Sequence, residues 1–167
     1  MEQAIRAFNK LKEEGVILDY AIGGGVAVTF YTEPIDTYDT DVFVLVPSGE
    51  PSLVFDVSTI YRKLSEMGGK SEGQYIIIGD TPVQVLIAPS ALEEEAIRTA
   101  TAIKYGDTPC KVFRPEHLVA ICLKTARTRD FYKAMLILEQ VSLDNNLLQS
   151  LVSRYGLEQQ WNRLNSK

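Results

Sequence analysis

The chain has 167 residues, of which 46% are hydrophobic and 23% are charged. This length and balance fit one soluble globular domain with a core of its own. The net charge of −5 argues against broad, non-specific binding to nucleic acid, which depends on many Lys and Arg side chains. Two cysteines are too few for a disulfide framework, and no segment has the pattern of a signal peptide or a membrane span. We therefore expect a cytoplasmic protein that does not bind to membranes.

The first two thirds of the chain alternate between helical and extended patterns. Apolar residues at helical spacing predict helices, and short apolar runs bounded by turn residues predict strands. The strands expected at 75–78 and 83–87 should form a hairpin, because a turn signal separates them. The helices expected here are 2–14, 26–31, 56–67 and 90–97, the strands are 16–22, 39–46, 75–78 and 83–87, with a turn at 47–51 and short strands within 100–113.

The last third of the chain has a helical composition. Pro115 opens a long helical segment, in which apolar residues from Leu118 to Leu138 repeat at helical spacing, and further helices are expected at residues 144–153 and 157–164. A shift in composition near residue 114 divides the chain into a mixed α/β part, residues 1–114, and a helical segment, residues 115–167. We expect the two parts to pack together as one compact domain.

Three consecutive glycines, Gly23, Gly24 and Gly25, separate the first strand from the second helix. Glycine lets the backbone approach a bulky anion, and amides at a helix N-terminus can point at phosphate oxygens. Asp39 and Asp41 open the next long strand, where alternate residues project on the same face. Two carboxylates held so close repel each other, and a divalent ion such as Mg²⁺, with phosphates completing its shell, would relieve that repulsion.

Each of these features also has an ordinary structural explanation. A glycine cluster is usually a tight turn, and an Asp pair at the start of a strand is usually solvated or caps the backbone. Their order is more specific, because a strand, a glycine turn, a buried helix and a polar loop precede the Asp-x-Asp strand. A Rossmann dinucleotide site fits poorly, since the glycines lack the Gly-x-Gly-x-x-Gly spacing and the Asp pair has no role there.

In this order, the motifs resemble the signature of the nucleotidyltransferase (polymerase β-like) superfamily, in which Gly-Gly or Gly-Ser precedes Asp-x-Asp. The segments 114–120 and 124–130 are similar to the helical part of minimal nucleotidyltransferases of the AbiEii-like branch, so the similarity extends over residues 16–140. The resemblance implies an α+β (α/β) fold, with a mixed sheet flanked by helices and a C-terminal helical segment.

The resemblance also implies a reaction. Asp39 and Asp41 would be catalytic and would hold Mg²⁺ or Mn²⁺ against a nucleoside triphosphate. An acceptor would attack the α-phosphorus, which transfers nucleoside monophosphate and releases pyrophosphate. The sequence leaves the acceptor open between a protein, a small molecule and the end of a tRNA. Contacts to the nucleotide phosphates are implied for Gly23, Gly24, Gly25, Thr37, Lys124, Arg127 and Arg129.

Two positions depart from the family pattern. The third carboxylate, expected on a later strand, is replaced by Gln84, which can ligate a metal through its carbonyl but cannot act as a general base. Asp80 or, more remotely, Asp56 could take its place, and Ile35 stands where relatives often carry an arginine. The alternative to an active enzyme is therefore a catalytically impaired protein that binds nucleotide or acts as a toxin–antitoxin-type partner.

Other residues have more than one interpretation. The basic residues of the helical segment could simply solvate one helix face, with Asp130 pairing locally. His117, the single histidine, is expected at the surface or at a helix cap rather than in a metal site. Five tyrosines could contribute to the wall of a cleft, and nothing in the sequence selects among them: Tyr31, Tyr38, Tyr61, Tyr75 and Tyr105.

Overall fold

The computed structural model describes residues 1–47 and 57–166. In this part of the chain, one mixed sheet of seven strands has the order β3-β4-β5-β2-β1-β7-β6. At its centre, β2 runs parallel to β5 and antiparallel to β1, and β1 runs parallel to β7. The strands are β1 (Asp19–Ile22), β2 (Thr40–Leu45), β3 (Lys70–Glu72), β4 (Tyr75–Ile78), β5 (Thr81–Ile87), β6 (Thr101–Tyr105) and β7 (Thr108–Val112).

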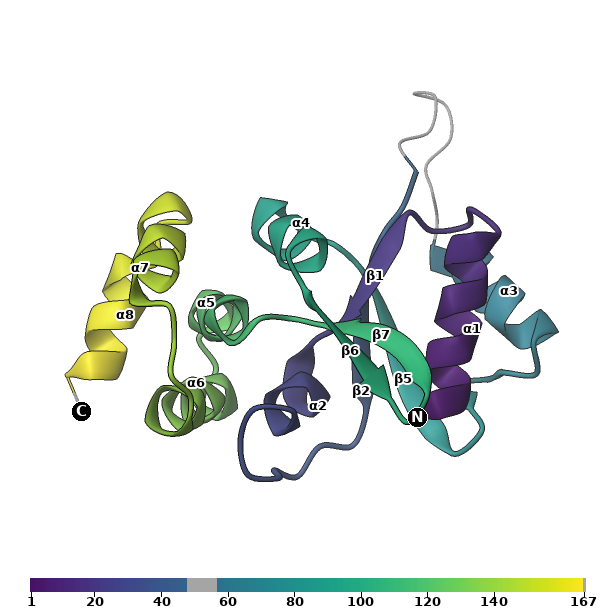
Figure 1. Cartoon of the computed structure of the whole chain (residues 1–167), viewed down its shortest axis with the longest axis horizontal. Helices are drawn as coiled ribbons and strands as arrows, with labels where there is room; N and C mark the ends of the chain where they lie inside the picture. Colours follow the sequence, from purple (N-terminus) through teal and green to yellow (C-terminus); the bar gives the residue numbers. More distant parts are fainter. Residues whose placement is uncertain (48–56, 167) are drawn as a thin grey trace.

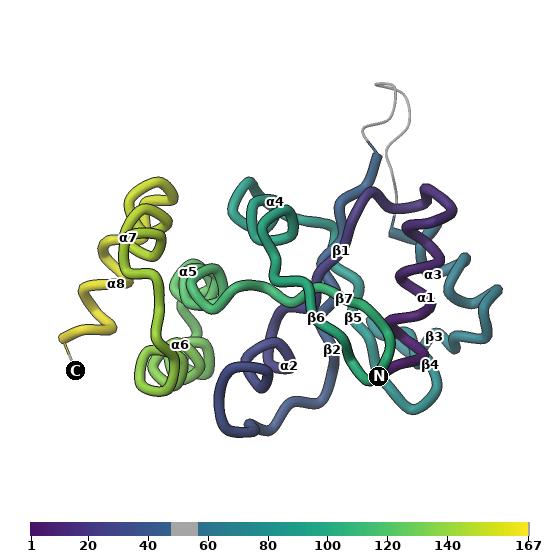
Figure 2. Tube along the Cα trace, viewed as in Figure 1, coloured from purple at the N-terminus to yellow at the C-terminus, as the bar shows by residue number. Residues whose placement is uncertain are grey.

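Helices lie on both faces of this sheet, which Figure 1 shows nearly edge-on. Helices α1 (Glu2–Glu13) and α3 (Val57–Glu66) cover one face, and α2 (Gly24–Thr29) and α4 (Ala91–Arg98) cover the other. The remaining helices extend the layer beyond α2 and α4, and Figure 2 traces the chain through them to its C-terminal end. They are α5 (Pro115–Thr125), α6 (Thr128–Gln140), α7 (Asn145–Arg154) and α8 (Glu158–Asn165).

The two faces of the sheet have separate hydrophobic cores, because side chains alternate along each strand. On β2, Val42 and Val44 belong to the core under α1 and α3, whereas Phe43 belongs to the other core. That second core also holds buried residues of the C-terminal helices, such as Leu148 and Leu164. The α/β part and the helical segment therefore share one continuous core.

The expected fold class is confirmed, and the differences are local. Strand β1 begins only at Asp19, because the amides of Val16 and Ile17 still donate to the Leu11 carbonyl at the end of α1. Helix α2 begins two residues earlier than expected, at Gly24. Strand β3 was not expected, since all of its residues are exposed and it has no apolar pattern. Most of the turn predicted at 47–51 lies outside the described residues.

The long helical segment after Pro115 consists of two helices rather than one. Ala126 has a left-handed backbone conformation, with φ of 53°, and this residue ends α5. An L-residue with a side chain adopts this conformation at a cost, so the corner between α5 and α6 depends on the packing around it. The corner turns α6 back along α5 and beside α2 (Figure 1).

Among the described helices, none is both long and apolar enough to cross a membrane.

Candidate functional site

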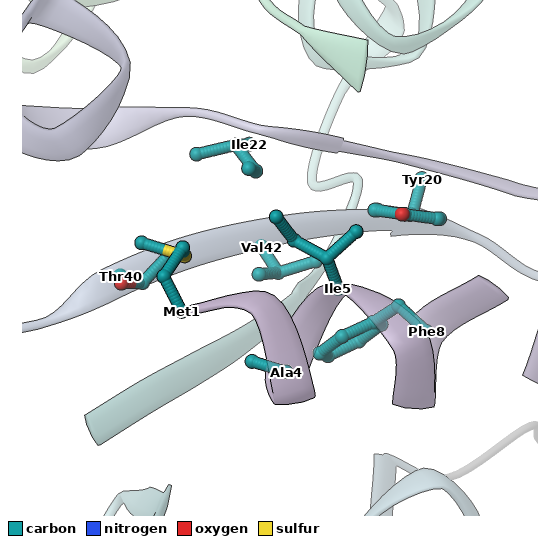
Figure 3. Close-up of a pocket in the computed structure, with 8 residues that line it drawn as sticks. All are labelled: Met1, Ala4, Ile5, Phe8, Tyr20, Ile22, Thr40 and Val42. Carbon is teal, nitrogen blue, oxygen red and sulfur yellow. The ribbon is translucent and has the colours of Figure 1, made fainter. Parts of the chain in front are cut away.

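Asp41 is the second residue of β2, and Asp39 lies directly before this strand, which was expected to begin at residue 39. Figure 3 shows Thr40 and Val42 turned toward α1, where Thr40 is buried. Because side chains alternate along a strand, Asp41 projects away from α1, on the face of the sheet that α2 covers. Both aspartates are half-buried, and the Asp39 carboxylate is close enough to Asp41 to raise the pKa of that residue. The structure therefore brings the two carboxylates together.

The three glycines surround Asp41 and the loop before it. The Gly23 amide donates to the Asp41 carbonyl at 2.9 Å, so this amide continues the β1–β2 ladder. Gly24 has φ of +60°, and a Cβ atom there would collide with the Asp41 carboxylate. A Cβ atom at Gly25 would lie 2.6 Å from the Thr37 hydroxyl. Each glycine thus permits a close approach, and the first amides of α2 have no partner within the helix.

Asp41 lies among several charges. Burial and, to a smaller extent, the Asp39 carboxylate raise the pKa of Asp41 to about 6. The positive charges of Lys133 and Arg129 on α6 act in the opposite direction and lower this pKa. Two mutually repelling carboxylates with basic side chains beside them form a site that suits a cation together with a phosphate-bearing ligand.

Helix α6 contributes two residues that the sequence did not assign to the site, Lys133 and Asp130. The Asp130 carboxylate is nearly buried, accepts a 2.8 Å hydrogen bond from the Thr125 hydroxyl and lies 3.5 Å from the Lys133 ammonium. The spacing of Arg129 and Lys133, four residues apart, places both on one side of a helix. That spacing was the available signal, but only the position of α6 shows that this side lies near Asp41.

Other basic residues occupy different surroundings. The Lys124 ammonium donates to both carboxylate oxygens of Glu93, at 2.7 and 2.9 Å, and to the Ser90 hydroxyl at 2.8 Å. Arg127 is exposed at the N-cap of α6. Phosphate contacts from Lys124 and Arg127 therefore stay predictions, and Lys124 would have to leave its ion pair to make one.

Gln84 lies on the strand next to the aspartates. It is the register partner of Asp41 in the parallel pair of β2 and β5, so the two side chains project on the same face. Asp80 lines a hollow beside α1 with Glu2 and Gln3, away from Asp41. Asp56 lies outside the described residues. Among the residues that are described, no three His, Cys, Asp or Glu side chains are grouped as metal ligands.

The donors beside Asp41 nevertheless suit a magnesium ion. Carboxylate and amide oxygens are hard ligands, and Mg²⁺ usually binds one or two carboxylates together with water and substrate phosphates. Asp39, Asp41 and the Gln84 carbonyl supply such a set.

His117 is fully buried, and the expectation of a surface position was wrong. Its Nε2 atom lies 3.4 Å from Glu95 and 3.5 Å from the Thr99 hydroxyl, between α4 and α5. Its neighbours on α5 include the apolar residues Leu118 and Val119. The packing of α4 against α5, which the local sequence does not reveal, decides the burial of His117.

The fold of the chain is similar to that of solved nucleotidyltransferase structures. No family model and no curated protein sequence matches the chain. The structure of ANT(2'')-Ia in complex with adenylyl-2''-tobramycin superposes with a TM-score of 0.52 and 18% identity, over 91% of this chain and 97% of that one. An antigenic nucleotidyltransferase-like protein from Paracoccidioides brasiliensis gives a TM-score of 0.57 and 17% identity, over 98% of this chain and 88% of that one. The chain therefore has the fold of these nucleotidyltransferases.

Proposed function

We propose that this protein is a metal-dependent nucleotidyltransferase, which moves a nucleoside monophosphate from a nucleoside triphosphate to an acceptor. The observation that carries the proposal is the closeness of the Asp39 and Asp41 carboxylates at the start of β2, with Gly24 directly against the Asp41 carboxylate. The shared fold supports the same reading. The AbiEii-like branch, the cytoplasmic location and a protein partner stay predictions.

Each residue of the site has a role in this proposal. Asp39, Asp41 and Gln84 would hold Mg²⁺ or Mn²⁺, which when bound neutralises charge on the α-phosphate oxygens. The backbone amides at the start of α2 would contact the phosphates, while the other proposed contacts come from Thr37 and the basic residues. Arg129 and Lys133 would counter the negative charge of the leaving pyrophosphate.

The transfer step follows from this arrangement. A nucleophilic oxygen or nitrogen of the acceptor forms a bond to the α-phosphorus, and the bond from that phosphorus to the α,β-bridging oxygen breaks. Pyrophosphate leaves with the bond electrons. The acceptor proton passes to solvent water, because the neutral amide of Gln84 cannot accept it.

Calorimetric titration of each nucleoside triphosphate, with and without Mg²⁺ or Mn²⁺, tests the proposal without an acceptor. We expect one triphosphate to bind only with metal. The double variant Asp39→Asn, Asp41→Asn should lose at least about 100-fold in affinity, since both metal-binding carboxylates are gone. Asp36→Asn, at an exposed position of the same loop, is the matched control and should bind normally. Equal affinity of the double variant and the parent would contradict the site.

A catalytically impaired nucleotide-binding protein is the second candidate, and Gln84 is the observation that favours it. Under this alternative, the triphosphate binds with metal but no pyrophosphate is released in the presence of candidate acceptors. Gln84→Asp restores a third carboxylate beside Asp41, so pyrophosphate release that appears only in this variant would establish the impaired state. Release by the parent protein at a comparable rate would exclude it.

A further inference from the structure

The aspartate site continues across the sheet onto an open surface. Asp41 on β2 pairs with Gln84 on β5. Because Val83 pairs with Ile76 in the antiparallel β4–β5 register, the next residue, Gln84, lies opposite Tyr75 on β4. Tyr75 in turn pairs with Glu72 on β3. Register partners project on the same face, so these four side chains form one row across β2, β5, β4 and β3. Because neighbouring strands are about 4.8 Å apart, Tyr75 lies about 10 Å from Asp41 along this row.

A second row runs beside the first. Pro82 pairs with Ile77, and Ile77 pairs with Lys70. Asp39 lies near the Pro82 end of this row, because the next residue, Thr40, pairs with Val83. Tyr75, Ile77 and Pro82 therefore form a mostly apolar strip on the aspartate face, with Lys70 and Glu72 at its outer border. The strip begins one strand away from the aspartates.

Within residues 1–47 and 57–166, neither hydrophobic core extends over the strip. Ile77 and Tyr75 are half-buried, yet neither belongs to either hydrophobic core, whereas Ile76 and Ile78 are buried in the core under α1 and α3. Helices α2 and α4, which lie on the strip's face of the sheet, pack mainly on β1 and β2. The outer strand β3 is exposed along its whole length.

Tyr38, directly before Asp39 in the sequence, lies against this strip. Its ring contacts the Tyr75 ring edge-on, with 5.8 Å between centroids and 65° between planes. The Tyr38 side chain is still 71% exposed. The contact with Tyr75 thus orients the Tyr38 ring beside the site, and most of the Tyr38 surface stays accessible to a ligand.

The geometry of the displacement indicates which ligand would lie over the strip. The glycine turn and β1 are on one side of Asp41, and β5 is on the other. In-line displacement places the attacking group opposite the leaving pyrophosphate. If the phosphates lie toward the glycines and α6, the acceptor approaches over Gln84 and its body extends over Tyr75.

We propose that the strip formed by Tyr38, Tyr75, Ile77 and Pro82 binds the nucleobase of a nucleoside acceptor, whose ribose hydroxyl is the nucleophile. This inference rests on the proposed function. A base stacks on an exposed tyrosine through its π-face, and the Gln84 amide can both donate to and accept from a polar edge. The chain's net charge of −5 favours a single nucleoside or a terminal nucleotide over an extended strand.

The test measures nucleoside binding by saturation-transfer NMR. The full chain is first saturated with Mg²⁺ and the α,β-methylene analogue of the triphosphate that binds. Adenosine, guanosine, cytidine and uridine are then the probes, and methyl β-D-ribofuranoside, which has no base, is the comparison. We expect at least one nucleoside to bind, with saturation strongest on its base protons, and the riboside to bind at least about tenfold more weakly.

Three variants locate the binding surface. Tyr38→Ala should weaken nucleoside binding about tenfold, and Tyr38→Phe should retain it, because stacking needs the ring and not the hydroxyl. Tyr105→Ala is the matched control, since this tyrosine is 41% exposed on β6 at the opposite edge of the sheet. The affinity for the triphosphate analogue should be unchanged in all three.

The outcomes separate the two proposals. Failure of the parent protein to bind the analogue with metal overturns the proposed function. If the analogue binds normally, three results would each overturn the acceptor surface alone. They are that no nucleoside binds, that the riboside binds as tightly as the nucleosides, or that Tyr38→Ala has no effect.

Discussion

Gly24 is the residue on which the geometry of the aspartate pair depends most directly. Its φ of +60° and the contact of its missing Cβ with the Asp41 carboxylate are separate constraints. Gly24→Ala should cost about 1–2 kcal/mol for the left-handed backbone. It should also displace Asp41 and abolish metal-dependent binding of the triphosphate, which calorimetry measures.

Gly73→Ala is the control for this prediction. Gly73 has nearly the same φ, +61°, but nothing lies within 4 Å of its missing Cβ. The backbone cost should therefore be similar while triphosphate binding stays normal. If both variants bind triphosphate as the parent does, Gly24 does not shape the site.

At the scale of elements, the packing of α4 on α5 makes stability depend on pH through His117. Burial lowers the pKa of His117 below its ordinary value of 6.5, and the nearby Glu95 only partly offsets this. The unfolded chain therefore binds a proton near pH 6.5 that the folded protein rejects. The contribution of His117 to stability should be constant above this pH and fall as the pH drops below it, by at most about 1.4 kcal/mol per pH unit. Asp41, whose pKa is raised to about 6, changes stability in the opposite direction over an overlapping range.

Urea unfolding of the parent and of His117→Gln between pH 7.5 and 5.5 measures this effect, and the variant should lose less stability than the parent as the pH falls. Glu95 contributes in a separate window. The Arg154 guanidinium lowers the pKa of Glu95 to about 2, so its stabilising ion pair is lost only as the pH falls from about 4.5 toward 2. An equal slope between pH 7.5 and 5.5 in His117→Gln and the parent would rule out His117 as the cause.

At the scale of the whole molecule, the shared core should make the chain unfold as one unit. Phe113 is fully buried, and the centroid of its ring lies 4.9 Å from that of Phe43, beside Gly23. Phe113 belongs to the core that also contains residues of the C-terminal helices. Phe113→Ala should cost about 3–5 kcal/mol. The midpoints of unfolding that are measured by fluorescence of Trp161, on α8, and by far-UV circular dichroism should shift together.

Phe8→Ala, in the core on the opposite face, is the matched variant for this prediction. It should also lower both transitions together. Separate midpoints for the two signals would mean that residues 1–114 and 115–167 unfold independently, and the expectation of one compact domain would be wrong.

Most elements could be predicted from the sequence, because local patterns specify them. The helix at residues 2–14, the hairpin around Gly79 and the helix start at Pro115 all follow from periodicity and turn chemistry. Strand β3 could not be predicted, since its three exposed residues have no pattern of their own and form a strand only by pairing with β4. The break at Ala126 was missed for a related reason, as alanine has no local preference for a left-handed backbone.

The sequence by itself determined the glycine turn, the Asp-x-Asp pair and the glutamine at position 84, because these are properties of residue type and spacing. Tertiary structure alone decided which distant groups meet them. It put α6 with Lys133 near Asp41, paired Lys124 with Glu93 instead, and set Tyr38 against Tyr75. The physical reason is that strand order and helix packing, which depend on contacts between distant segments, fix the neighbours of each side chain.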